Sequence, residues 1–240
     1  MKIDVLFSPV QTDELFFTGK TTVVIDVLRA SSTIITALSN GAKEVVPVGT
    51  VEFAVKVSGG IFGGQTLLGG ERNTKKIEGF ALGNSPSEYT QEIVEGKTIV
   101  FYSTNGSRAI VKAKYSGNLF ICSFNNMKAI SNHLKKISSD VIILCAGNNN
   151  FLSLEDSVCA GMLVNELNAE ENKILLTDSS NTAMTLFKSF GENIDKLLSE
   201  TDHGQLLKIN GYESDLKACA KLDSTKVIPY YSGNALKVLK

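Results

Sequence analysis

The arginines of this chain occupy few positions. Only three of its 24 basic residues are arginines, Arg29, Arg72 and Arg108, and the others are lysines. A guanidinium presents a planar fork of donors that suits carboxylate and phosphate, whereas lysine is a mobile point charge. All three arginines lie in segments rich in Ser, Thr, Asn or Gly, so we predict that they recognise an oxyanion. The alternative is that they form structural ion pairs with carboxylates.

Small polar residues accompany these arginines. The segments 26–33 and 103–108 each follow an apolar run and lead into a helical pattern. Ser31, Ser32 and Ser107 therefore lie at predicted helix starts, where free backbone N–H groups and the helix dipole favour an anion. For any single serine, a helix-capping role is the alternative. The convergence of several such starts with three arginines favours an anion site.

Four carboxylates belong to the same group of segments. Asp26 ends an apolar strand candidate, where burial is costly for a carboxylate unless it is paired or bound to a metal. Glu71 precedes the second arginine, while Glu155 and Asp156 begin a helical pattern and also form a capping-box sequence with Ser153. Carboxylate oxygens, completed by water and a phosphate, suit Mg²⁺. With two histidines and no H-E-x-x-H sequence, a zinc site is disfavoured.

The elements that must position these residues alternate between strands and helices. Short β-branched runs predict strands, and longer patterned stretches predict helices. Such alternation predicts an α/β/α sandwich with a mostly parallel sheet, whose ligands bind beyond the carboxyl ends of the strands. We expect one domain over residues 1–240, with a long loop or irregular hairpin at 69–76. The predicted strands are 3–7, 22–27, 44–48, 98–102, 119–123, 141–145 and 173–177, and the predicted helices are 32–40, 51–57, 85–94, 107–115, 126–137, 154–168, 181–189, 193–199, 203–209 and 213–221.

A repeated pattern predicts an internal duplication. Residues 22–56 and 98–132 share the order strand, loop, helix, Gly, strand, helix at an offset of 76 residues. The identical pairs are Thr22 and Thr98, Val24 and Val100, Ser31 and Ser107, Ile34 and Ile110, Ala37 and Ala113, and Gly41 and Gly117. Two ordinary βαβα units of similar composition are the alternative. In either case the loops 28–32 and 103–108 are expected in equivalent places.

Composition limits the partners that the chain can have. Its formal net charge is −1 and 43% of its residues are hydrophobic, which is enough for a packed core. The balanced charge argues against nucleic acid and against an anionic membrane as partners. We expect a cytoplasmic protein, since no apolar run reaches the roughly 20 residues of a membrane span and the first residues do not form a signal peptide. The four cysteines show no C-x-x-C spacing, which favours buried thiols. A homodimer is a plausible assembly at this length.

Several longer motifs resemble the 2-phosphosulfolactate phosphatase family. They are VIDVLRASST at 24–33, GERN at 70–73, KIEGF at 76–80, LGNSP at 82–86, STNGSRA at 103–109, SLED at 153–156 and CAG at 159–161. The stretch from His203 to Pro229 is also similar to the end of that family. The resemblance spans nearly the whole chain. Ser103 and Ser107 depart from it, because the family more often has Thr there.

The resemblance implies a Mg²⁺-dependent phosphatase that converts 2-phospho-3-sulfolactate to 3-sulfolactate and phosphate, a step of coenzyme M biosynthesis where that pathway exists. A phosphate, a carboxylate and a sulfonate together carry about four negative charges near neutral pH, so binding them requires fixed donors and a metal. The candidate catalytic residues are Asp26, Arg29, Arg72 and Arg108; the candidate substrate-binding residues are Ser31, Ser32, Asn73, Lys76, Ser103, Thr104, Asn105, Gly106, Ser107 and His203; and the candidate metal ligands are Asp26, Glu71, Glu155 and Asp156.

Three mechanisms are compatible with these residues. Water activated by a carboxylate is favoured over Asp26 as a nucleophile, because Asp26 lacks the second Asp of a D-x-D motif. A serine nucleophile is disfavoured, because no G-x-S-x-G sequence is present. The competing function class is a non-catalytic protein that binds a small organic anion as a sensor. If the chain is the enzyme, replacing any of the three arginines by alanine is expected to lower kcat/KM with little loss of Tm.

Overall fold

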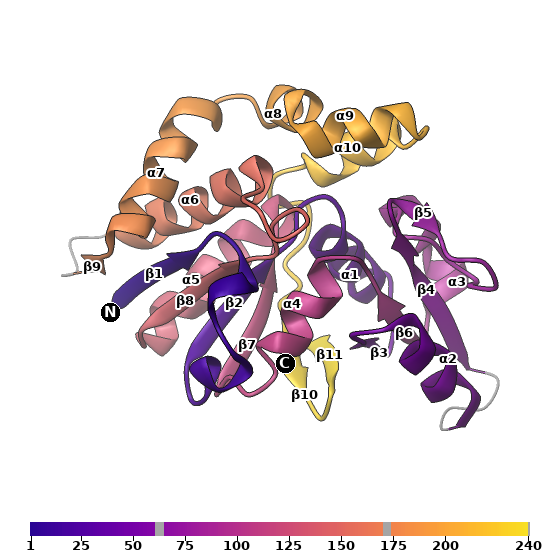
Figure 1. Ribbon diagram of the computed structural model, residues 1–240. Coiled ribbons are helices and arrows are strands. Elements are labelled where there is room, and N and C mark those ends of the chain that lie inside the picture. The colour runs from indigo at the N-terminus through magenta and orange to yellow at the C-terminus, as the bar shows by residue number, and fades with distance from the viewer. Residues whose placement is uncertain (61–64, 170–173, 240) are drawn as a thin grey trace.

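The strands join into one sheet in the part of the chain that the computed structural model describes, residues 1–60, 65–169 and 174–239 (Figure 1). The strands are β1 (Lys2–Leu6), β2 (Thr21–Ile25), β3 (Glu44–Pro47), β4 (Thr66–Arg72), β5 (Lys75–Lys76), β6 (Thr98–Tyr102), β7 (Asn118–Cys122), β8 (Val141–Cys145), β9 (Leu175–Leu176), β10 (Pro229–Ser232) and β11 (Ala235–Val238). Their order across the sheet is β5-β4-β6-β3-β11-β10-β7-β2-β8-β1-β9. Six of the neighbouring pairs are parallel. The predicted α/β fold with a mostly parallel sheet is confirmed.

Helices cover both faces of this sheet. They are α1 (Ala30–Ser39), α2 (Val51–Gly60), α3 (Gln91–Val94), α4 (Gly106–Lys112), α5 (Met127–Ile137), α6 (Leu154–Asn168), α7 (Asp178–Phe190), α8 (Ile194–Glu200), α9 (Asp202–Ile209) and α10 (Glu213–Cys219). Val24 packs with α1 and α4 on one face, while its neighbour Val23 packs with α5 and α6 on the other. Both valines are fully buried, as a central parallel strand requires. Helices α8 to α10 form a further layer at the top of Figure 1.

The two segments predicted to be duplicated have the same element order. One runs β2-α1-β3-α2 and the other runs β6-α4-β7-α5. The first strand of each segment pairs with the second strand of the other, because β2 lies beside β7 and β6 lies beside β3. The antiparallel hairpin β10–β11 joins β7 to β3 between them. This arrangement is what a duplication would produce, and the duplication itself stays a prediction, as does the extent of the domain.

Four strands lie outside the predicted set, namely β4, β5, β10 and β11. The segment 69–76 is a hairpin whose first arm extends a parallel strand beside β6, and whose second arm, β5, turns back along it. Two consecutive glycines concealed this strand in the sequence, since glycine weakens a strand pattern. Gly70 is required there, because a Cβ at this position would clash with the backbone of Tyr102. The predicted helix 85–94 is divided into a short 3₁₀ turn, Pro86–Glu88, and α3.

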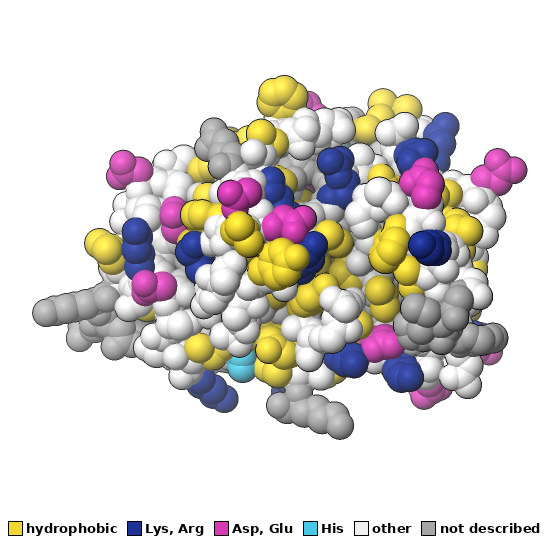
Figure 2. Space-filling view, turned by 60° about the horizontal axis from the view of Figure 1, so that its bottom comes forward, with side chains coloured by type: hydrophobic (Ala, Val, Ile, Leu, Met, Phe, Trp, Pro, Cys, Tyr) yellow, Lys and Arg dark blue, Asp and Glu magenta, His cyan; other side chains and the backbone are white. Residues whose placement is uncertain are grey.

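The surface and the cysteines follow the composition. Basic and acidic side chains are interspersed with apolar ones on the face shown in Figure 2. All four cysteines are free and buried, as their spacing predicted. Among the described residues, no helix is both long enough and apolar enough to cross a membrane.

Candidate active site

A cavity of about 220 Å³ lies beyond the carboxyl ends of β2, β4, β6 and β8. Parallel sheets place ligand sites at this edge. Seven of the residues predicted from the sequence line it: Asp26, Arg29, Glu71, Asn73, Thr104, Asn105 and His203. They come from three strand-end loops and from α9, so the fold brings together segments separated by more than a hundred residues.

Asp26 is the first residue after β2 and is 6% exposed. Its Oδ1 accepts a hydrogen bond from the backbone N–H of Ala30, 3.1 Å away, at the start of α1. The pKa of Asp26 is raised to about 6, chiefly by burial and to a smaller extent by the charges of Glu71 and Glu155, while His203 and the Ala30 amide oppose the shift. A carboxyl group that titrates near neutral pH in a cavity is typical of an active site.

Glu71 ties two of the loops together. Its Oε1 accepts a hydrogen bond from the backbone N–H of Thr104 at 2.7 Å, and its Oε2 accepts one from the backbone N–H of Thr74, also at 2.7 Å. The carboxylate is 7% exposed. Because one buried side chain holds the turn after β4 against the turn after β6, Glu71 fixes the relative position of both walls of the cavity.

Asp156 plays a similar part between β2 and β8. Its Oδ1 accepts from the backbone N–H of Val27 at 2.8 Å, and its Oδ2 accepts from that of Gly147 at 3.1 Å. Burial raises the pKa of Asp156 well above its ordinary value, and the charges of Asp26 and Glu155 add to the shift. Ser153 caps α6 through the backbone N–H of Asp156, so the capping pattern seen in the sequence forms at the edge of the site.

Glu155 pairs with His203, which lines the cavity, but Glu155 and Asp156 are not among the lining residues themselves. His203 Nδ1 lies 3.5 Å from Glu155 Oε1, and the imidazole is 16% exposed. Burial opposes the charged form of His203, but the hydrogen bond and charge of Glu155 together with the charge of Asp26 outweigh it and raise its pKa. Thr201 caps α9 and thereby holds His203 in the first turn of that helix.

Arg29 is buried at 2% exposure, and its guanidinium is held by two segments, the β4–β5 turn and the start of α10. Its Nη1 donates to Asp215 Oδ2 at 2.6 Å, and its Nη2 donates to the carbonyl oxygen of Thr74 at 2.7 Å. The guanidinium also lies over the ring of Tyr212, 4.2 Å from the centroid, and Ser85 donates a hydrogen bond to Asp215. Arg29 therefore forms the structural ion pair given above as the alternative, and it lines the cavity as well.

The carboxylates around this cavity are compatible with a Mg²⁺ ion that takes only one or two ligands from the protein. Mg²⁺ keeps several waters and is commonly bound by one or two carboxylates together with substrate phosphate. Among the described residues, no three Asp, Glu, His or Cys side chains are grouped as metal ligands. Both carboxylate oxygens of Glu71 and of Asp156 already accept from backbone amides, whereas the hydrogen bond from Ala30 to the Asp26 carboxylate engages Oδ1. The mutual repulsion of these buried carboxylates is the electrostatic situation that a cation relieves.

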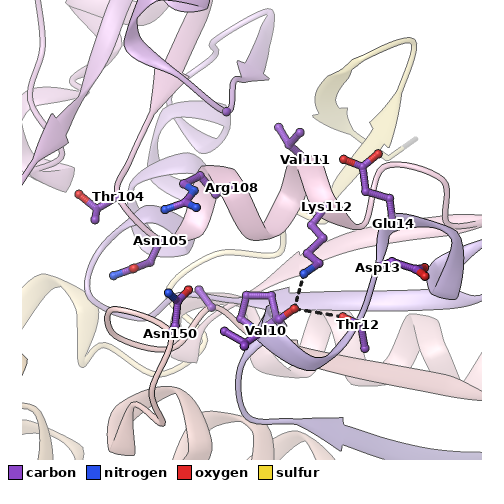
Figure 3. Close-up of a pocket in the computed structure, with 13 residues that line it drawn as sticks. Val10, Thr12, Asp13, Glu14, Thr104, Asn105, Arg108, Val111, Lys112 and Asn150 are labelled. Carbon is purple, nitrogen blue, oxygen red and sulfur yellow. Dashed lines mark hydrogen bonds between the residues drawn. The ribbon is translucent and has the colours of Figure 1, made fainter.

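The other two arginines lie elsewhere. Arg108 is exposed on α4 and lines a neighbouring cavity of about 540 Å³, where its side chain extends toward Thr104 (Figure 3). Thr104 and Asn105 form a wall shared by the two cavities. Arg72 and Lys76 are exposed on the β4–β5 hairpin and do not line the smaller cavity. We place the site in the smaller cavity, because the buried carboxylates, the histidine and the buried arginine meet there.

Comparison with known proteins identifies the family of this chain. A family model described as 2-phosphosulpholactate phosphatase matches residues 7–234. The chain belongs to this family. A protein of Clostridium acetobutylicum named "Probable 2-phosphosulfolactate phosphatase" is 39% identical over 236 residues, 98% of this chain and 100% of its own length. Proteins with the same name from Clostridium beijerinckii and Symbiobacterium thermophilum are 38% and 39% identical and cover 96% and 92% of this chain, and 97% and 95% of their own.

The serines that suggested anion binding in this family member brace the loops instead of lining the cavity. Ser31 Oγ accepts from the backbone N–H of Asp26, and Ser32 Oγ donates to the carbonyl of Val27. Ser103 and Ser107 each accept from the other's backbone N–H at 2.8 Å. All four are at most 1% exposed. Gly106 is buried against the Asp26 carboxylate, where a Cβ would clash. Contact of these five residues with a substrate stays a prediction.

Sequence reasoning did not select several residues of the site. Thr74, Asn84, Asn148 and Asn149 line the cavity, and Asp215 holds Arg29. The available signal for Asn84 was its place in the LGNSP motif, and for Asn148 and Asn149 it was their position in the loop after β8. No local pattern links Asp215 to a residue 186 positions earlier.

Proposed function

We propose that this chain is a Mg²⁺-dependent phosphatase that hydrolyses 2-phospho-3-sulfolactate, or a similar phosphorylated hydroxy acid, to 3-sulfolactate and phosphate. The observation that carries the proposal is a buried Asp26 with a raised pKa in one small cavity with Arg29 and His203. The names of the relatives support the same reaction.

The size of the cavity supports a small substrate. At about 30 Å³ for each water in the liquid, its volume of about 220 Å³ holds roughly seven waters. Pockets for drug-sized ligands are larger, about 300–1,000 Å³. A three-carbon acid with one phosphate is in the appropriate range.

The proposed Mg²⁺ is held mainly by the Asp26 carboxylate, with Glu71 and Glu155 adding negative charge around it. When bound, the cation would offset the charge of these carboxylates and polarise a phosphate oxygen. This supports a site in which a highly anionic substrate lies beside acidic side chains, an arrangement that would otherwise be repulsive.

The chain's own groups supply binding and proton transfer. The guanidinium of Arg29 has five N–H donors, of which two are used by Asp215 and Thr74, and those that remain can bind substrate oxygens. In the proposed reaction a water oxygen forms a bond to phosphorus as the bond to the C2 oxygen breaks. The proton of that water passes to a cavity carboxylate, and the C2 oxygen takes a proton from His203, whose raised pKa favours the protonated ring that this donation requires.

Phosphate release from 2-phospho-3-sulfolactate, measured with Mg²⁺ and with a chelator, tests the proposal. Turnover that requires Mg²⁺ is expected. Turnover without the metal would contradict the cofactor, and tight binding without turnover would support the competing sensor function. Trapping of phosphate or beryllofluoride on Asp26 would replace attack by water with an aspartyl phosphate.

The setting of this activity is also a proposal. We place it in the cytoplasm, since four buried free thiols suit a reducing compartment. A small anionic substrate is the proposed partner, with neither nucleic acid nor membrane involved, and a homodimer is the proposed assembly. Light scattering would test the homodimer, and a salt-dependent DNA-binding assay would test whether nucleic acid binds.

A further inference from the structure

Three buried side-chain oxygens in the described part of the chain have no hydrogen-bond partner: Thr66 Oγ1, Thr74 Oγ1 and Asn84 Oδ1. A buried polar atom without a partner is costly, and native proteins contain few of them. Thr74 and Asn84 both line the candidate active site and are 7% and 4% exposed, whereas Thr66 lies in β4 and does not line that cavity. Two of the three residues that carry an unsatisfied oxygen therefore line the same small cavity.

Thr74 is held firmly by its backbone while its hydroxyl stays free. Its N–H donates to Glu71 and its carbonyl oxygen accepts from Arg29, each at 2.7 Å. Its φ of 70° lies in the left-handed region, which a β-branched residue rarely adopts. Two buried charged side chains thus hold a threonine in a costly conformation in which its hydroxyl has no partner in the protein.

Asn84 is fixed in the same way. Its carbonyl oxygen accepts from the Thr33 hydroxyl at 2.9 Å. The residue before it, Gly83, accepts from the Tyr89 hydroxyl at 2.6 Å, and the residue after it, Ser85, donates to Asp215. The segment is anchored on both sides of Asn84, and the side-chain amide remains uncommitted. Rotation of that amide exchanges its oxygen and its N–H donors, so it can meet either kind of ligand group.

We infer that Thr74 and Asn84, beside Arg29, form a subsite for the acid group of the substrate that is not transferred, a carboxylate or a sulfonate. The inference rests on the proposed function and names residues that determine its specificity. The hydroxyl of Thr74, the amide of Asn84 and the remaining N–H groups of Arg29 are donors of the kind that bind such an oxyanion. The phosphate then lies toward Asp26 and His203.

The contacts of Arg29 explain why the acid group binds at this subsite. Arg29 touches Thr74 directly and reaches the neighbour of Asn84 through Asp215. The ion pair with Asp215 fixes the guanidinium, so the donors are in place before the substrate arrives. Asp215 balances the charge of Arg29, and the remaining N–H donors of the fixed guanidinium suit a permanent anion.

The test compares Thr74→Val with wild type on four phosphate esters: 2-phospho-3-sulfolactate, 2-phospholactate without the sulfonate, 2-sulfoethyl phosphate without the carboxylate, and p-nitrophenyl phosphate with neither acid. We expect Thr74→Val to lower kcat/KM about 10- to 100-fold for the natural substrate and for one of the two single-acid esters, which identifies the bound group. Turnover of p-nitrophenyl phosphate should change less than twofold. Because an unpartnered hydroxyl is removed, Tm should stay the same or rise.

Two further variants sharpen the result. Thr66→Val removes the unpartnered hydroxyl that is not in the cavity and is expected to leave all four reactions unchanged. Thr74→Ser keeps the hydroxyl and is expected to restore most of the activity, while Asn84→Asp should oppose the same acid group by charge repulsion. A uniform loss on all four esters, or no loss, would overturn the subsite.

Failure of the proposed function can be told apart from failure of the subsite. If wild type hydrolyses none of the esters, the phosphatase function is wrong, and binding of 3-sulfolactate is then measured by calorimetry. Weaker binding by Thr74→Val than by Thr66→Val would still support the subsite. Equal binding, or none by any variant, would overturn it.

Discussion

At an offset of 76 residues, the loop between β2 and α1 and the loop between β6 and α4 begin their helices at matching residues, Ala30 and Gly106. The serine that follows each of them has the same task. Ser31 Oγ accepts from the backbone N–H of Asp26, and Ser107 Oγ accepts from that of Ser103. Each hydroxyl joins the end of a strand to the start of the following helix by a hydrogen bond.

The two loops differ in where they carry charge. Asp26 corresponds to Tyr102, and the buried Arg29 corresponds to Asn105, while the exposed Arg108 has no arginine at the matching position in the first loop. The first loop supplies the buried carboxyl group and the buried guanidinium. The second supplies small polar groups and the close approach of Gly106 to Asp26. A common framework thus carries different chemistry, because bracing needs a serine at one position and leaves the neighbours free to vary.

The largest effect is expected from Asp26. Asp26→Asn should lower kcat by about 10³-fold, since it removes the buried carboxylate proposed to hold the metal or to activate water. The matching change in the second loop, Tyr102→Phe, should leave kcat within about threefold. Steady-state phosphate release measures both. Equal losses would show that the two loops contribute alike, against the comparison drawn above.

The next largest difference is expected between the alanine variants of Arg29 and Arg108. Arg29→Ala leaves Asp215 buried without its partner and should lower the free energy of unfolding by about 3–5 kcal/mol, together with kcat/KM. Arg108→Ala alters an exposed side chain and should change stability by at most about 0.5 kcal/mol. Urea unfolding and kcat/KM measure the pair. This revises the expectation that Arg29→Ala would have little effect on Tm; a stable Arg29→Ala would contradict the structural role of the pair.

The pH dependence should follow Asp26. Its pKa is raised from 3.8 to about 6 in the folded protein, so the folded state binds a proton more strongly than the unfolded state does. Between these two values the contribution of Asp26 to the free energy of unfolding should fall as pH rises. In contrast, kcat/KM should rise with pH through about 6, because the ionised form is the active one, and Mg²⁺ should move this limb to lower pH.

Urea unfolding of the metal-free protein and of Asp26→Asn, from pH 4 to 7, measures the first effect, and pH–rate profiles at two Mg²⁺ concentrations measure the second. A pH–rate limb unaffected by Mg²⁺ would separate Asp26 from the metal.

The smallest effect is expected at the two bracing serines, and the loss of stability should be similar for both. Ser31→Ala and Ser107→Ala each leave a buried backbone N–H without its acceptor and should cost about 1–3 kcal/mol of stability. The two losses should agree within about 1 kcal/mol, whereas kcat should change little in either variant. Thermal unfolding with activity assays checks this. A large loss of kcat in one variant alone would make that serine a substrate ligand after all.

Sequence reasoning predicted the parallel core strands well, because runs such as 22–27 and 98–102 are apolar on both faces and leave few alternatives. It missed β4, where Gly69 and Gly70 interrupt the pattern, and the β10–β11 hairpin, whose four-residue strands lie within a polar tail. Among candidate site residues, the sequence pattern selected those that closely follow a strand, such as Asp26 and Thr104, and these line the cavity. Thr74 and Asp215 were not, since their significance depends on what they touch.

By itself the sequence determined the alternation of strands and helices, the edge of the sheet where a site would form and the family to which the chain belongs, because these depend on local pattern and on motifs. The tertiary structure decided which arginine turns inward. Arg29, Arg72 and Arg108 are chemically identical and lie in similar loops, but among the residues that the structure describes only Arg29 meets a buried carboxylate, Asp215, and an aromatic ring, Tyr212. A buried charge requires a partner at hydrogen-bond distance, and that partner comes from a distant part of the chain that folding alone brings near.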